Sequence, residues 1–436
     1  GNSLPADLYH QKGVLLMILQ KEKQIEYIDK IMDWCFIGLV FILPIAHTMT
    51  IRSVFIYLPV FLWLYKMALK REVLFVNNQM AIPLSLFAII ATFSMFTAVD
   101  PRYTLHELRG EMVTDFLLFF LLFNNIRTAE QINKIILSLI IGSIVQGIYS
   151  SVHYFSLDWN LLNPGINVGG LTAGNISYSV FLITVIPFVI YKIITSTGKS
   201  RYFFAAALIL NLFMLSLTHQ RGALLALFVQ FLLFFWFIRR RLLVLLLVGA
   251  GILFLFIMPS SLLYHGHPKI DLKTENALEA NNSINSRIAI WKFTIKEIAE
   301  RPFSGIGFGR YSFAAKYQQF KRTSLWHSHN TLLNLTLQIG IQGLLIFIFI
   351  LYRLIMTAWI GFKETKGEPR YFFLGVFIFI VGFFVRNMFD DHYVDDNAQM
   401  FWALMGINTA LFIHIQKLAY NDIFSRSWFL LRRKSI

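Results

Sequence analysis

Long apolar runs recur along most of this chain and limit what it can fold into. A helix of about 17–25 mostly apolar residues crosses the ~30 Å hydrocarbon core of a bilayer. Hydrophobic residues make up 56% of the 436 residues and charged residues only 14%, whereas a soluble domain carries about 25% charged residues. A membrane barrel would show alternating segments of about 10 residues instead. We therefore predict an all-α integral membrane protein.

The apolar runs predict about twelve transmembrane helices. They lie at roughly 32–50, 53–69, 80–98, 113–124, 135–155, 171–191, 202–218, 222–238, 242–257, 330–352, 371–388 and 398–416. The fourth run is the shortest, and an earlier start of its helix, within HELRGEMV, is the alternative. The first three residues, Gly-Asn-Ser, are interpreted as a cloning remnant and take no part in the fold prediction.

The net charge of +15 is interpreted as a membrane signature. With a cytoplasmic N-terminus, most Lys and Arg residues fall in cytoplasmic segments, as the positive-inside rule requires. Attraction to anionic lipid headgroups explains this charge better than binding to nucleic acid. The single cysteine, Cys35, excludes an internal disulfide.

The domain order follows from this orientation. We expect a cytoplasmic N-terminal segment (1–31), nine spans (32–257), a periplasmic loop (258–329), three spans (330–416) and a basic cytoplasmic tail (417–436). The expected location is the inner, cytoplasmic membrane of a bacterium, with both termini in the cytoplasm.

Ionisable residues are expected at the outer ends of the spans, because charge is costly at the bilayer centre. Arg221 opens a span in THQRGALLALF, and Arg386 ends one. Guanidinium groups pair with phosphate oxygens, so the headgroup of a lipid-linked diphosphate fits this depth. A snorkelling interfacial arginine is the alternative for Arg221.

The outward loop contains an amphipathic helix in SINSRIAIWKFTIKEIAERPF, with Trp291 on its apolar face, followed by the turn SGIGFGRY. Arg287 lies in the first turn of this helix, where a cation is unfavourable. A bound anion would offset that cost; a solvated loop arginine is the alternative.

The segment HSHNTLLNLTLQIGIQG places His327 and His329 before an apolar helix. In a helix, residues i and i+2 face different ways, so the pair is predicted to be a poor metal site, and a lone histidine base is favoured over an interfacial histidine with one hydrogen bond. On a helical wheel Gly340 and Gly343 share the face of His329, and small residues there allow close packing.

Four aspartates and His392 lie in RNMFDDHYVDDNAQMFW. A divalent metal site and a solvated acidic loop are both conceivable. The segment lacks the spacing of an EF-hand, so the acidic loop is preferred, and we expect no metal and no cofactor.

Three motifs together resemble the superfamily of O-antigen ligases and O-antigen polymerases. They are the Arg-Gly segment QRGALLAL, the loop helix with its glycine-rich turn (285–311), and His-Asn followed after nine residues by GIQG. The large outward loop between late spans fits as well. RNMFD is similar to a further arginine and acid of the family.

The resemblance implies transfer of a glycan from undecaprenyl diphosphate to a sugar hydroxyl of the lipid A–core oligosaccharide at the periplasmic face. The family mechanism is regarded as inverting and metal-independent. Arg221 and Arg287 would bind the diphosphate and His329 would act as the base. Four further residues are candidates for substrate binding: Trp291 and Asn330 in these motifs, Arg386 in RNMFD, and His327, which has no position in the family's signature and whose role stays open. An O-antigen polymerase is the alternative enzyme, and a flippase or exporter of lipid-linked oligosaccharides the alternative from another class.

Overall fold

The computed structural model describes residues 6–71, 79–157, 168–238, 284–320 and 325–433. Within these ranges the regular elements are all helices. Seven of them are long and apolar enough to cross a membrane, and two shorter apolar stretches accompany them. The prediction of an all-α, multi-pass membrane protein is therefore confirmed. The ninth predicted span (242–257) and the start of the predicted loop lie outside the described residues.

The seven long apolar stretches are α2 (Met49–Lys70), α6 (Ala129–Leu157), α7 (Asn175–Thr195), α8 (Gly198–Leu217), α15 (Thr331–Glu364), α16 (Gly367–Asn387) and the first part of α17 (Asp395–Arg433). The two shorter ones are α3 (Ala81–Phe93), which continues into the 3₁₀ turn η1 (Ser94–Phe96), and α9 (Arg221–Phe237). Helix α1 (Ala6–Ile42) precedes them all.

Two predicted boundaries change. The first predicted span, 32–50, is not one helix, because α1 ends at Ile42 and α2 begins at Met49. The helical run that contains the short fourth span begins earlier than predicted. It includes the alternative segment HELRGEMV and starts before it, at Pro101. Helix α4 (Pro101–Glu107), the π-helical turn η2 (Leu108–Val113) and α5 (Thr114–Asn125) follow one another without a gap. Asp100 caps this run by accepting a hydrogen bond from the Tyr103 N–H, and Pro101 occupies the first helical position.

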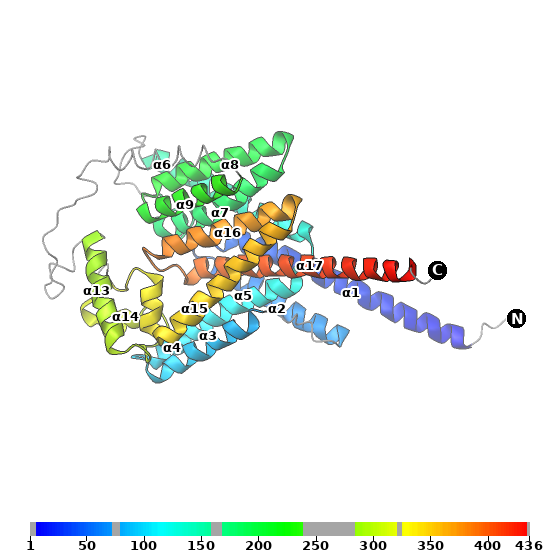
Figure 1. Cartoon of the computed structure of the whole chain (residues 1–436), viewed down its shortest axis with the longest axis horizontal. Helices are drawn as coiled ribbons and strands as arrows, with labels where there is room; N and C mark the ends of the chain where they lie inside the picture. The colour runs from blue at the N-terminus through cyan, green and yellow to red at the C-terminus, as the bar shows by residue number, and fades with distance from the viewer. Residues whose placement is uncertain (1–5, 72–78, 158–167, 239–283, 321–324, 434–436) are drawn as a thin grey trace.

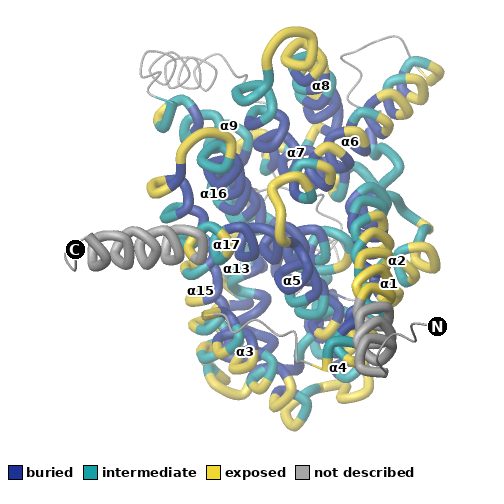
Figure 2. The backbone as a smooth tube through the Cα atoms, turned by 90° about the vertical axis from the view of Figure 1, so that its right-hand side faces the viewer, coloured by how far each residue is buried: buried dark blue, intermediate teal, exposed yellow. Residues whose placement is uncertain are grey.

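Helix α16 packs against α7, α9 and α15, and α5 packs against α17. Figure 2 shows α5, α7 and α16 as the buried centre of the bundle, while α2, α3 and α8 carry exposed faces. Large apolar side chains such as Phe61 on α2 are exposed on those faces. This is the arrangement that a lipid environment requires.

The elements outside the bundle gather at one end. Helices α13 (Ile284–Glu300) and α14 (Ser312–Lys316) and the turn η3 (Gln318–Phe320) lie there, whereas the N-terminal end of α1 and the C-terminal end of α17 extend from the opposite end (Figure 1). A small apolar core holds the α13 end together, with Ile290, Phe313 and Phe320 buried in it.

Helix α15 is interrupted at Gly340, whose φ of 77° and ψ of 174° are not helical. The break leaves backbone groups of α15 without helical partners. The glycine-rich turn after α13 supplies partners for them. Ile341 N–H donates to the Pro302 carbonyl at 2.8 Å, and the Leu337 and Gln338 carbonyls accept from N–H groups of that turn at 2.9 and 3.0 Å. The turn must be glycine-rich because it approaches very closely: a Cβ at Gly305 would lie 2.3 Å from the Gln338 carbonyl oxygen.

Candidate active site

The candidate site lies where α15 begins, beside the loop that follows α16. The Asn330 side chain accepts a hydrogen bond from the Leu333 N–H at 3.1 Å and so caps α15. Its amide nitrogen donates to the Met388 carbonyl at 3.1 Å, which joins the helix to the loop. His329 has a φ of 49°, so the chain turns sharply and the imidazole precedes the helix. The predicted face shared by His329 and the two glycines does not exist, because His329 is not helical and α15 breaks at Gly340.

His327 and His329 lie side by side. Their ring centroids are 3.9 Å apart, and the His329 N–H donates to Nδ1 of His327 at 3.1 Å. Both rings face Asp390: Nε2 of His327 is 3.6 Å and Nδ1 of His329 is 3.3 Å from its Oδ1. The prediction that the two histidines face different ways was wrong, because it assumed that both belong to the helix.

Asp390 lies at the centre of the cluster and is buried. Besides the two histidines, Nε2 of His392 and Nη2 of Arg386 each lie 3.7 Å from its Oδ2. Burial alone would raise the pKa of Asp390, but His392, the hydrogen bond to His329, His327 and Arg386 outweigh burial and hold that pKa well below its usual range. The carboxylate is therefore ionised at neutral pH.

The two other imidazoles of the cluster are neutral at pH 7. Burial, and after it the charge of Arg386, lower the pKa of His392 to about 3. Burial also lowers the pKa of His327 well below its usual value. When Nδ1 of His329 carries the proton and donates it to Asp390, Nε2 is left as the basic nitrogen. A carboxylate that holds an imidazole in this way fixes its tautomer and its orientation.

Three arginines surround the cluster. Arg386 ends α16, where a cation complements the helix dipole, and it is only 2% exposed. Arg287 in the first turn of α13 lies close enough to Asp390 and Arg221 for both charges to act on it: burial and Arg221 lower its pKa, and Asp390 raises it. Gly222 makes room for Arg386, since a Cβ there would lie 3.3 Å from Nη1. Arg221 itself is exposed at the start of α9.

Several buried donors around these arginines have no acceptor in the described part of the chain. They are Nε of Arg287, Nε of Arg386 and Nε1 of Trp291. Arg287 and Trp291 are one turn apart on α13, so they share a face. An unsatisfied buried donor costs about 1–3 kcal/mol, and an anion bound beside the arginines would remove that cost.

A metal ion is the other ligand that this geometry admits. His327, His329 and Asp390 each offer a ligand atom, and these atoms lie within 4.8 Å of one another. However, Arg386 lies beside the same carboxylate, and Arg287 acts on it as well. A divalent cation here would be repelled by guanidinium groups that stay charged. The charges therefore favour an anion at this site.

Sequence reasoning recognised only part of the polar cluster. RNMFD, which ends at Asp390, resembled an arginine and an acid of the family, but residues 390–392 were interpreted as part of a solvated acidic loop, and Asp390, Asp391 and His392 are buried. Asp391 accepts hydrogen bonds from the Thr331 hydroxyl at 2.8 Å and the Asn334 amide at 2.5 Å. The spacing of Arg386 and Asp390 by four residues was the available signal, since it allows an ion pair across a helix end.

Comparison with known proteins finds a family similarity in one segment of this multi-pass membrane protein. Residues 206–348 match the model of the O-antigen ligase family. That segment includes α9, α13, the glycine-rich turn and the broken part of α15. The resemblance found in the sequence is confirmed for these residues.

A putative polysaccharide ligase of Rickettsia bellii is similar to this chain. It is 26% identical over 145 residues, which make up 30% of this chain and 33% of the relative. The match therefore spans about a third of the relative's length.

Proposed function

We propose that this protein is an O-antigen ligase. It transfers a glycan from undecaprenyl diphosphate to a sugar hydroxyl of the lipid A–core oligosaccharide. The site would face the periplasm and both termini the cytoplasm of an inner-membrane protein. The position of α13 and α14 at the end opposite the start of α1 and the end of α17 (Figure 1) supports this orientation.

The single observation that carries the proposal is the set of buried N–H donors without acceptors beside three arginines. Arg386 and Arg287 come from two different helices and act on one carboxylate, Asp390, and Arg221 from a third helix lies close enough to Arg287 for its charge to act there. A diphosphate offers several anionic oxygens, and guanidinium groups bind such oxygens in pairs. The polyprenyl tail of the donor would remain in lipid beside α9, whose exposed N-terminal arginine would meet the headgroup.

In the proposed reaction, Nε2 of His329 takes the proton of the acceptor hydroxyl. The hydroxyl oxygen attacks the anomeric carbon of the donor sugar from the face opposite the diphosphate. The bond between that carbon and the diphosphate oxygen breaks, and its electron pair leaves with the diphosphate. The configuration at the anomeric carbon is therefore inverted.

Each residue has a physical task in this step. A positioned base contributes roughly 10²–10⁴-fold to the rate. Asp390 holds the ring of His329 and stabilises the imidazolium that forms. The arginines stabilise the charge that develops on the leaving diphosphate, and they do so without reorganising. His327 fixes the backbone of His329 through its Nδ1.

The test is reconstitution of the purified protein in liposomes with undecaprenyl-diphosphate glycan. Lipid A–core is supplied in one set of vesicles and a second lipid-linked glycan in another. We expect lipid A–core to be extended, with EDTA leaving the rate unchanged. Extension of the lipid-linked glycan alone would show a polymerase, and movement of intact donor across the bilayer without transfer would show an exporter.

Exposed Glu130 on α6, which pairs only with Lys134 in the described contacts, provides a control. Glu130→Gln should turn over like the wild type. A requirement for a divalent ion, restored after EDTA treatment, would contradict the mechanism without metal.

A further inference from the structure

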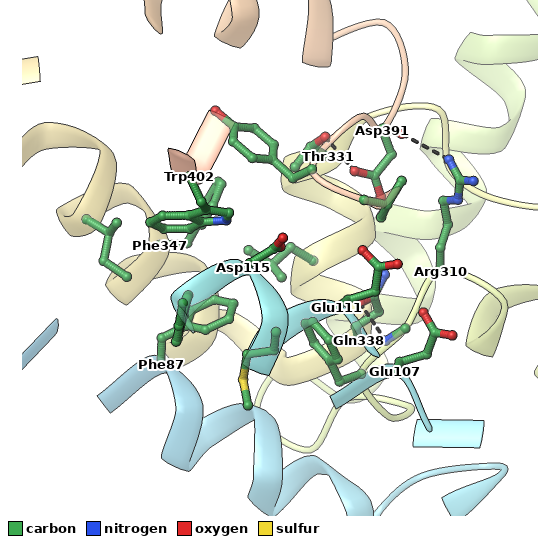
Figure 3. A pocket seen from close by; sticks show the side chains of 18 residues that line it. Phe87, Glu107, Glu111, Asp115, Arg310, Thr331, Gln338, Phe347, Asp391 and Trp402 are labelled. Carbon is green, nitrogen blue, oxygen red and sulfur yellow. Dashed lines mark hydrogen bonds between the residues drawn. The ribbon is translucent and has the colours of Figure 1, made fainter. Parts of the chain in front are cut away.

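A cavity lies next to the histidine cluster, with Thr331 and Asp391 among its lining residues. Its empty space, counted together with the open solvent at its mouth, is about 680 Å³. Figure 3 shows two kinds of wall. Glu107, Glu111 and Asp115 lie on one side, and the rings of Phe87, Phe347 and Trp402 on the other.

The cavity contains polar groups whose hydrogen bonds are not satisfied by the described residues. Asp115 is only 4% exposed, lines the cavity, and its Oδ1 has no partner. The hydroxyl group of Tyr393, another lining residue, is buried without a partner. A buried carboxylate oxygen and a buried hydroxyl that remain unpaired are costly, so both groups fit a ligand that donates and accepts hydrogen bonds.

The local helix geometry turns the carboxylates into this cavity. Glu111 lies in the π-helical turn η2, and Asp115 follows in the first turn of α5. π-helical turns are uncommon and occur often at functional sites. The Asp395 N–H donates to Glu111 at 2.7 Å, which ties this turn to the start of α17.

The donor diphosphate fits this cavity poorly. Four lining carboxyl groups, those of Glu107, Glu111, Asp115 and Asp391, accompany one lining arginine, Arg310, whereas the anionic oxygens of a diphosphate are bound by several guanidinium groups.

A single metal ion does not fit either. In the described part of the chain, the ligand atoms that converge within 4.8 Å belong to His327, His329 and Asp390, and the carboxylates of the cavity are not among them. Separated acceptors along one wall suit a neutral ligand with several hydroxyl groups.

The geometry points to this cavity as the subsite for a neutral sugar ring of the acceptor. The carboxylates accept hydrogen bonds from its hydroxyl groups, and the aromatic rings cover its apolar C–H faces. This inference rests on the proposed function only for the identity of the acceptor.

Two residues connect the cavity to the base. Thr331 and Asp391 line the cavity, and the Thr331 hydroxyl donates to Asp391 at 2.8 Å and to the Asp390 carbonyl at 3.4 Å. Since Thr331 is two residues from His329, a sugar in the cavity has a short path to the imidazole.

The test uses two nearly isosteric variants, Asp115→Asn and Glu111→Gln, in the full-length protein. Kinetics are measured with lipid A–core varied at saturating donor and then with the donor varied at saturating acceptor. Binding of deacylated lipid A–core oligosaccharide and of inorganic pyrophosphate is measured separately by calorimetry. Glu130→Gln is the matched control, and thermal unfolding reports whether each variant is folded.

We expect both variants to raise the KM for the acceptor roughly tenfold or more, as expected for a lost charge-assisted hydrogen bond, with the KM for the donor unchanged. Oligosaccharide binding should weaken in parallel, and pyrophosphate binding should persist. An unchanged acceptor KM in folded variants, or an equal rise for the donor, would overturn the subsite. Binding of Mg²⁺ or Ca²⁺ that disappears in Asp115→Asn while sugar binding persists would overturn it too.

The binding data separate this inference from the proposed function. Oligosaccharide binding that depends on Asp115 in a wild-type protein without transfer activity would support the subsite and contradict the ligase. Normal transfer activity with an acceptor KM that is unchanged in both variants would support the ligase and contradict the subsite.

Discussion

Asp390 and Asp391 are neighbours in the sequence but lie in opposite surroundings. Asp390 faces histidines and Arg386. Asp391 faces the uncharged groups of Thr331 and Asn334 and lines the acidic cavity. One carboxylate thus belongs to a cationic half of the site, which suits a diphosphate, and the other to an anionic half, which suits a neutral sugar. Two identical side chains acquire different tasks from their neighbours alone.

Of the substitutions that test this comparison, removal of the base should have the largest effect on the transfer rate. His329→Ala is expected to lower the transfer rate by roughly 10²–10⁴-fold, because nothing then takes the proton of the acceptor hydroxyl. Pyrophosphate binding should remain, since the arginines are untouched. The rate is measured in liposomes, with membrane insertion checked in parallel. Near-normal transfer by a folded His329→Ala protein would remove the base assignment.

Replacing each of the two aspartates by Asn in separate variants tests the comparison directly. Asp390→Asn should lower the rate by up to about 10⁴-fold, the loss found when the carboxylate that orients a catalytic histidine is replaced by Asn. Asp391→Asn should act mainly on the KM for the acceptor. Steady-state kinetics with each substrate varied in turn would show the difference. Indistinguishable kinetic profiles for the two variants would mean that the site is not divided in this way.

The cationic half can be weakened without removing charge. Arg221→Lys is expected to raise the KM for the donor about tenfold, because a point charge replaces a planar fork that binds two oxygens. The KM for the acceptor should not change. Wild-type kinetics in this variant would indicate an arginine that only snorkels to the membrane surface.

The pH dependence of stability should be the smallest of these effects. His392 has a pKa of about 3 in the folded protein, against about 6.5 when unfolded. The unfolded chain therefore binds a proton that the folded chain does not, and stability is lost as the pH falls below about 6.5. Between pH 7 and pH 5 the loss from this group is about 2 kcal/mol.

The loss can be measured as a fall in the thermal unfolding temperature in detergent over the same pH range. His392→Asn should reduce this slope, and His327, whose pKa is also lowered, should account for part of the remainder. A slope of the opposite sign would show that these imidazoles are charged in the folded state.

The sequence predicted the composition of this site better than its geometry. The apolar runs were enough for the all-α membrane fold, and Arg221, Arg287, Arg386 and His329 were each recognised as unusual at a span or helix end. Contacts between segments far apart in the chain were not predictable from periodicity. The burial of residues 390–392 depends on α15 and α16 packing together.

The helical-wheel prediction failed where the backbone leaves the helical conformation. The positive φ of His329 and the break at Gly340 invalidate any wheel drawn through residues 327–343. The cavity needed three-dimensional information as well, because its carboxyl groups come from α4, η2, α5 and the loop before α17.

The hydrogen bonds between the break in α15 and the glycine-rich turn mean that neither segment can be exchanged without the other. A chimera that receives residues 302–309 from a relative but keeps 337–342 would bury amide groups without partners within the bundle. For anyone who wishes to alter glycan selectivity by grafting outer loops, the smallest transferable unit is therefore the turn together with the interrupted helix.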